Sequence, residues 1–503
     1  MFDRVFLFEV NGPTLPLVRE RLSRLPHLRR AFETGAWGKL IGSLPPAPTA
    51  AMASLYTGMN PGRTGLFDFL GFPAGGYDRV PYDARRLESE PFFRRLSERG
   101  RRVGLLNVLL THPLPDLDGF VVTADETAAD QYAGPEPVLR QLRSWGYRVP
   151  FGAAYAPGRD MEFLEHTLQD LEMRRRALLE LFGSEPWQFG MLSIFDFGEL
   201  LHPFWRYYDS RHPAYLPVAE VFSRRDPLLE ALKLVDRMVG EIVAMAGPGG
   251  LMMVMGAWGH RLEHTRVHVN EWLREQGHLR FRRRPGTLAR ALACHAGLTT
   301  ARAEGLARRI NIYKRYQYGM QRGKRASLKG RLFLGHGDID WFRTRAAAVG
   351  YLGQVYLNVR NHRPHGVIPG ASYDTEREQL RKRLIGMTDP RNGSRMIDAV
   401  HTRDEIYRGD RLTDAPDLII QYREGYVGDD GFAGTGRLIS GNPSKESSDH
   451  WQESFFCAMG QGVRPGEVSV RLEDIAPTIL SALDTEIPDD LDGRVLPILN
   501  HRA

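Results

Sequence analysis

The chain has 503 residues, of which 42% are hydrophobic and 25% are charged, a composition ordinary for a globular protein. It holds no apolar run long enough to cross a membrane as a helix. Its two cysteines, Cys294 and Cys457, are too few for a disulfide framework, and its N-terminus lacks a signal-peptide pattern. We therefore expect no membrane association and a cytoplasmic location.

The net charge of +6 is unevenly distributed along the chain. Between Arg280 and Arg331, fifteen Lys and Arg residues stand against a single acidic residue, Glu304. Such a run is typical of a solvated insertion, and alternatively of a patch for phosphorylated ligands, nucleic acid or an acidic partner. No nucleic-acid-binding motif accompanies the charge, so nucleic acid is the weaker alternative.

Apolar spacing predicts alternating strands and helices along the whole chain. In chain order these are a strand at 4–10, a helix at 15–32, a strand at 37–41, helices at 49–57 and 91–99, a strand at 103–108, a helix at 161–182, a strand at 187–195, a helix at 219–245, a strand at 251–255, a helix at 269–277, strands at 355–358 and 417–420, and a helix at 472–483. This alternation predicts an α/β fold with a largely parallel central sheet and helices on both faces.

The strand at 251–255 consists of five apolar residues in a row, as expected for a strand buried on both faces. The turn after such a strand is where an α/β enzyme usually keeps its chemistry. Here that turn carries Ala257 and Trp258, which neither bind a metal nor carry a proton. The methionines of the strand are expected to pack in the core.

Short motifs follow one another along nearly the whole chain: LPHL (25–28), LPP (44–46), TGMNPG (57–62), GLFDF (65–69), NV (107–108), HVNEWL (268–273), APDL (415–418), DIAPT (474–478) and LDGRV (491–495). In these motifs the chain resembles the alkaline phosphatase superfamily, and within it the type I phosphodiesterase/nucleotide pyrophosphatase branch. The resemblance implies one alkaline-phosphatase-like α/β domain over residues 1–503, with a helical insertion at 124–182 and a basic insertion at 281–337.

The resemblance also implies two zinc-type ions about 4 Å apart, held by Asp and His residues, with a Thr or Ser nucleophile between them. Two of the seven positions that carry this chemistry keep the family's residue here, namely His202 and His450. The other five differ: Asn11, Gly198 and Ala257 stand in place of aspartates, Pro48 in place of the nucleophile, and Trp258 in place of a histidine.

These replacements affect the two metal sites differently. The second site would use Asn11, Pro48, Ala257 and Trp258, which offer no anionic ligand, and a tryptophan alone buries about 150–250 Å². We expect this site to be lost. The first site keeps two imidazoles beside Gly198, so we expect no metal cofactor, with a single weak metal on His202 and His450 as the alternative.

Several polar residues remain as candidates for catalysis: His202, Glu199, His260, His450 and Thr49. Glu199 and His202 have i, i+3 helical spacing and can face one way. Asp196 and Asp449 are further carboxylates that are candidates to replace the missing one. His260, Glu263 and His264 are assigned to a loop after the central strand, either as acid–base groups or as surface residues. Thr49 is expected to cap the helix that begins beside it.

The sequence therefore favours a catalytically degraded phosphodiesterase-like protein that binds a small ligand, phosphorylated or not, or a partner protein. The alternatives are an enzyme with a rebuilt pocket performing metal-independent chemistry in a specialised biosynthetic pathway, and a one-metal phosphoric-ester hydrolase. A homo-oligomer remains open. The expected pocket residues are Asn11, Pro48, Thr49, Asp68, Asn107, Gly198, His202, Ala257, Trp258, Asp449 and His450.

Overall fold

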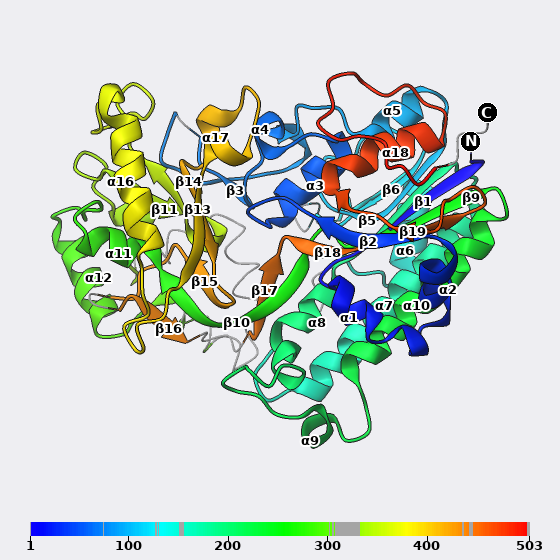
Figure 1. Ribbon diagram of the computed structural model, residues 1–503, viewed down its shortest axis with the longest axis horizontal. Helices are drawn as coiled ribbons and strands as arrows, with labels where there is room; N and C mark the ends of the chain where they lie inside the picture. Colours follow the sequence, from blue (N-terminus) through cyan, green and yellow to red (C-terminus); the bar gives the residue numbers. More distant parts are fainter. Residues whose placement is uncertain are drawn as a thin grey trace.

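The computed structural model describes residues 2–499 except 74, 126–127, 129, 150–154, 301, 304–305, 307–331, 435–436 and 442–445. Its centre is a ten-stranded sheet with helices above and below it (Figure 1). The strands run in the order β19 (Gly466–Glu467), β2 (Ala36–Ile41), β18 (Glu453–Gly460), β9 (Gly250–Met255), β1 (Arg4–Val10), β8 (Phe189–Ile194), β5 (Val103–Val108), β6 (Gly119–Thr123) and β7 (Ala133–Gly134), with β20 (Val470–Arg471) beside β2.

The predicted largely parallel sheet is confirmed. Strands β9, β1, β8, β5 and β6 are mutually parallel, while β18 is antiparallel to both β9 and β2. Strands β9, β1 and β8 are fully or almost fully buried along their length, because helices cover both faces of the sheet.

Side chains alternate across β1 and divide the core into two layers. Phe6 and Phe8 join a cluster on one face, where the covering helices are α1 (Leu15–Arg19), α2 (Pro26–Thr34), α6 (Glu136–Ser144), α7 (Asp160–Ser184), α8 (Asp196–Phe204), α9 (Val218–Phe222) and α10 (Pro227–Ala246). Val5 and Leu7 join the cluster on the other face, under α3 (Pro48–Thr57), α5 (Phe92–Glu98) and α18 (Ile475–Ala482). Figure 1 shows these two helical layers on either side of the sheet.

A second body of structure lies beside the central sheet, at the left of Figure 1. Its antiparallel sheet has the order β11 (Ala346–Val349), β12 (Gln354–Leu357), β14 (Leu418–Tyr422) and β13 (Ile397–Thr402). The nearby helices are α11 (Val269–Glu275), α12 (Pro285–His295), α16 (Tyr373–Ile385) and α17 (Arg403–Ile406). This part has an apolar cluster of its own. The smaller elements α4 (Pro61–Thr64), β3 (Leu70–Gly71) and β4 (Val80–Pro81) lie between α3 and α5 in the sequence.

The segment after β9 is a strand, so its assignment to a loop was wrong. Strand β10 (Gly259–His268) pairs with β15 (Gly425–Asp429), β16 (Ile439–Gly441) and β17 (Ser448–Trp451). These partners lie far along the sequence and supply both its hydrogen bonds and its burial. The run itself is rich in His, Arg and Glu, so its sequence lacks the apolar alternation that marks a strand.

Prolines divide two of the predicted helices. The helix expected at 15–32 is split, and α2 begins at Pro26; the helix expected at 219–245 is split, and α10 begins at Pro227. Proline is favoured in the first turn of a helix and breaks its interior. About half of the basic insertion at 281–337 lies outside the described residues. Within the described residues no helix is long and apolar enough to span a membrane.

Candidate functional site

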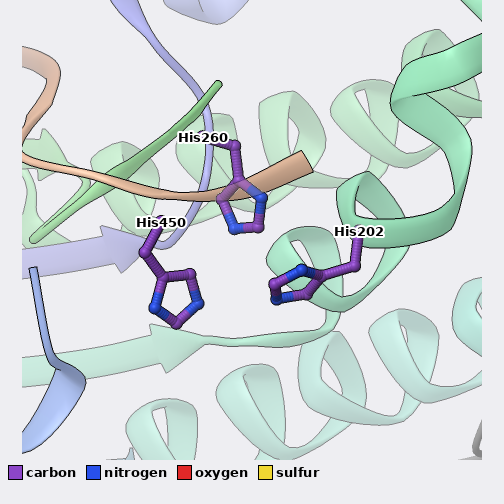
Figure 2. A group of neighbouring side chains, drawn as sticks. All are labelled: His202, His260 and His450. Atoms are coloured by element: carbon purple, nitrogen blue, oxygen red, sulfur yellow. The ribbon is translucent and has the colours of Figure 1, made fainter. Parts of the chain in front are cut away.

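Three histidines from three elements meet at the edge of the central sheet. His202 comes from α8, His260 from β10 and His450 from β17, and their ligand nitrogens all lie within 4.8 Å of one another. The ring centroids are 4.5 Å apart for His202 and His260, 5.3 Å for His202 and His450, and 5.1 Å for His260 and His450. Figure 2 shows the three rings facing one shared space.

The strand register brings this group together. His260 lies directly opposite His450 in the antiparallel pair β10–β17, where facing side chains are close neighbours. Helix α8 follows β8 and contacts both β10 and β17, which places His202 against the pair. The site thus lies beyond the carboxyl ends of parallel strands, where α/β proteins usually bind ligands.

Ser448 fixes the orientation of two of the rings. Its carbonyl oxygen lies 2.9 Å from His202 Nδ1 and accepts that proton. Its Oγ donates to the carbonyl oxygen of Leu201 at 2.9 Å, so toward His260 Nδ1, also at 2.9 Å, it acts as the acceptor. In the neutral form of each ring the proton therefore lies on Nδ1, which leaves the lone pair of Nε2 free. His260 Nε2 is buried and has no hydrogen-bond partner within the described part of the chain.

Burial and neighbouring charges set the protonation of the three rings. Burial, together with the charges of the neighbouring histidines, holds the pKa of His260 and of His450 well below the usual value. Burial also disfavours the charged form of His202, but nearby carboxylates, Glu199 first among them, outweigh it and raise the pKa of His202. Two of the three rings are therefore neutral at pH 7 and able to act as ligands.

The other half of the family's site does not fit a metal. Trp258 is 3% exposed, with its ring 5.3 Å from that of His450 and 6.2 Å from that of Phe195. The carbonyl oxygen of Trp258 accepts a hydrogen bond from Gly12 N at 3.1 Å, and this bond places Trp258 beside Asn11. Ala257 is fully buried and Pro48 is the first residue of α3. These four residues include no carboxylate, imidazole or thiolate, the groups that hold a zinc-type ion.

A buried acid that the sequence did not point to lies beside this half of the site. Glu9 in β1 is 0% exposed and faces Ser193, the backbone of Ala257 and Asn11. Burial raises the pKa of Glu9 to about 8, so the carboxyl is protonated at neutral pH. The available signal was its position as the only acid in an otherwise apolar strand interior, two residues before Asn11.

Several other candidates have partners elsewhere. Asn107 donates from Nδ2 to the carbonyl oxygen of Ser193 at 2.7 Å. Thr49 lies inside α3, whose N-cap is Ala47, and its hydroxyl donates to the carbonyl oxygen of Asp68. The expectation that Thr49 caps the helix was therefore wrong, because Pro48 starts the helix one residue earlier than predicted.

The remaining acid–base candidates contribute to different degrees. Glu199 is exposed on α8 and acts on His202 through its charge, as Asp449 does. Asp196 forms an ion pair with the buried guanidinium of Arg174, at 3.5 Å. The Nδ1 of His264 lies 2.8 Å from the hydroxyl of Thr265, and this ring is not part of the three-histidine group.

A cavity of about 20 Å³ lies beside His450, which is room for about one water molecule. Its lining includes Arg261, Asp449 and Trp451. The Arg261 guanidinium lies 3.8 Å from the centre of the Trp451 ring, and burial lowers the pKa of Arg261 to about 10, so it remains a cation at neutral pH.

Comparison with known proteins bears on the fold and the family. The family model for type I phosphodiesterase / nucleotide pyrophosphatase matches residues 5–435. The crystal structure of the alkaline phosphatase PafA is similar with a TM-score of 0.56 at 13% identity, over 99% of each chain. Phosphonoacetate hydrolase from Sinorhizobium meliloti 1021, in complex with phosphonoformate, gives a TM-score of 0.56 at 14% identity, over 96% of this chain and 95% of that one. No curated protein matches the chain.

Proposed function

We propose a function from the premise that this chain belongs to the type I phosphodiesterase / nucleotide pyrophosphatase family. In this proposal the chain does not hydrolyse phosphoesters by the family's two-metal route. It instead binds a small anionic group, such as a phosphate, at the half of the site that has kept its polar residues. The protein is then a catalytically degraded relative of the phosphodiesterases.

One observation carries the loss of hydrolysis. Trp258 is buried between His450 and Phe195, where the family resemblance places a metal-binding histidine. In two-metal catalysis the paired ions stabilise both the attacking and the leaving oxygen. Metal ions also lower the pKa of a hydroxyl nucleophile, and Pro48 has no hydroxyl at all. In this proposal the chain therefore lacks both the residues that would hold the second ion and a hydroxyl nucleophile at position 48.

The Arg261 guanidinium is the feature that supports an anionic ligand, since His450 is neutral at pH 7 and Glu263 and Asp449 bring carboxyl groups to the lining of the same cavity. Arg261 and His450 both line it, and Arg261 is held in place by a hydrogen bond of 2.6 Å to the carbonyl oxygen of Tyr422 and by the ring of Trp451. A guanidinium is the side chain best suited to a phosphate, because its N–H groups form paired hydrogen bonds. The cavity has room for about one water molecule, so a large organic ligand is disfavoured and a phosphate can enter only if the lining side chains move apart.

A one-metal phosphoric-ester hydrolase is the second candidate. It is favoured by the convergence of His202, His260 and His450, a set that suits a catalytic ion with one open position. Hydrolysis that depends on one metal and is lost with these histidines would select this candidate.

The test combines a hydrolysis assay with a binding measurement. Phosphodiester and phosphomonoester turnover by the purified full chain, with and without added Zn²⁺ or Mn²⁺, should equal the buffer blank. Inorganic phosphate should bind in calorimetry, and Arg261→Gln should weaken binding at least tenfold. The matched control is Arg423→Gln, an arginine 52% exposed beside the cavity strand β14, which should bind as the wild type does. Metal-stimulated turnover would refute the loss of hydrolysis, and equal binding by both variants would refute the ligand site.

A further inference from the structure

We propose that His260 takes the place of the carboxylate that Gly198 lacks, and that His202, His260 and His450 together hold one divalent transition-metal ion. The inference goes beyond the proposed function, because the three-imidazole set differs from the family's aspartate-containing set. It also holds independently of whether the protein binds phosphate.

The spacing of the three rings suits one ion. Zinc lies about 2.0–2.1 Å from a histidine nitrogen, and tetrahedral geometry then sets the ligand nitrogens about 3.3 Å apart. In the metal-free rings the nitrogens lie within 4.8 Å of one another. Closing this gap shortens the nitrogen–nitrogen distances by at most about 1.5 Å, which rotations about the side-chain torsions can supply. No backbone rearrangement is needed, because the β10–β17 register already holds His260 and His450 opposite each other.

The hydrogen bonds behind the rings are those a metal site needs. A metal-bound histidine usually donates its other N–H to a carbonyl or hydroxyl oxygen, which fixes the tautomer. Ser448 plays this part for two rings, through its carbonyl oxygen to His202 and its Oγ to His260. The buried Nε2 of His260, which has no protein partner in the described residues, is the atom left to face the ion.

Gly198 explains why His260 is the third ligand. A Cβ placed on Gly198 would lie 3.6 Å from His260 Nε2 and 3.4 Å from the carbonyl oxygen of Asn11. A carboxylate on that Cβ would extend into the space where Nε2 now lies. Aspartate at 198 and histidine at 260 are therefore alternative ways to fill one coordination position, and this chain uses the second.

The chemistry of the donors indicates the class of ion. Three imidazoles without a carboxylate suit Zn²⁺, Cu²⁺, Ni²⁺ or Fe²⁺, whereas Mg²⁺ and Ca²⁺ require oxygen ligands. Glu199, Glu446 and Asp449 are close enough to act on the charge of His202, so they partly offset the positive charge of a bound ion. Three protein ligands leave one position open.

The first test measures zinc binding by titration calorimetry and elemental analysis on the full chain. The wild type should bind one Zn²⁺ per chain, and His260→Ala should weaken binding at least a hundredfold. His264→Ala, which removes a histidine four residues along the same strand, should bind zinc as the wild type does. Circular dichroism and thermal melting identify a variant that fails to fold. Equal zinc affinity in His260→Ala and the wild type would overturn the proposal.

The second test exchanges the two ligands and does not depend on His260→Ala alone. Gly198→Asp in the wild type should weaken zinc binding, because the carboxylate and His260 compete for one space. The double variant Gly198→Asp with His260→Ala should regain at least tenfold of the affinity lost in His260→Ala. A double variant no better than His260→Ala would refute the idea of one shared position. Failure to bind any metal would refute this inference and leave the proposed function standing, whereas two ions per chain would refute the proposed function.

Discussion

At the scale of single residues, the site is divided between an apolar half and a polar half. Trp258 and Ala257 are almost completely buried in the core cluster under α3 and α18. Trp258 also contacts the ring of His450, so the indole forms one wall of the three-histidine group. In the proposed account, the residues that take the place of one metal position therefore also support the ring positions around the other.

Glu9 gives a prediction about pH. Its pKa is about 8 in the folded protein because of burial, against the usual 4.5. Between these two values the unfolded chain loses this proton and the folded chain keeps it, so stability falls as pH rises through that window. The cost above pH 8 is on the order of 5 kcal/mol. Glu9→Gln, which keeps the shape without the charge, should raise the free energy of unfolding by about 4 kcal/mol at pH 8 and leave it nearly unchanged at pH 4.5.

The measurement is urea unfolding of the wild type and Glu9→Gln at both pH values, with a chelator present. Glu20→Gln serves as the control, because the Glu20 side chain is 71% exposed and its loss should change stability by less than about 0.5 kcal/mol at either pH. A Glu9→Gln variant equally destabilised at pH 4.5 and pH 8 would show that Glu9 is ionised in the folded protein.

The residues of the site could be predicted to different extents. The resemblance carried over position by position, so the sequence identifies His202, His450 and the five replaced positions. His260 was named as a catalytic candidate but was assigned to a loop and left out of the metal site, because its burial depends on β17, about 190 residues further along the chain. Glu9 gave only a weak signal, since one acid in an apolar strand does not reveal that both of its faces are covered.

At the scale of elements, β10 joins the central sheet to the smaller antiparallel part. It begins beyond β9 with Gly259 and His260 in the site and ends at His268, where α11 starts. Along the way it pairs with three later strands. Helices and parallel strands follow local apolar spacing and were predicted well, whereas β10 depends on distant partners and was not.

A second link between elements gives a stability prediction. Asp236 in α10 is 4% exposed, and its carboxylate accepts from Leu28 N at 2.7 Å and His27 N at 3.3 Å. It thus satisfies unpaired N–H groups in the first turn of α2. Asp236→Ala should lower the free energy of unfolding by about 1–3 kcal/mol, the cost of leaving buried donors without partners.

Denaturant unfolding curves measure this difference. Glu241→Ala on the same helix is the matched control, since Glu241 forms an ion pair with Arg175 in which both side chains are about one-fifth exposed, and it should cost less than about 1 kcal/mol. An Asp236→Ala variant no less stable than Glu241→Ala would show that the carboxylate does not support α2.

At the scale of the whole molecule, the fold is shared with proteins whose sequences are very different. The chain keeps the alkaline-phosphatase-like arrangement at 13–14% identity to the solved structures, because a parallel sheet covered on both faces depends on apolar patterning more than on particular residues. Site function depends on a few side chains at strand ends. The fold and the site residues could be predicted from the sequence where local apolar spacing or a family motif determines them.

The central claim is that one metal position survives here on three imidazoles while the other is filled by Trp258. The most direct measurement is a crystal structure of zinc-soaked protein with anomalous diffraction at the zinc edge. The account predicts one strong anomalous peak per chain, about 2.0–2.1 Å from a nitrogen of each of His202, His260 and His450. A second peak of similar height beside Asn11 and Trp258, or a peak bound without His260, would contradict it.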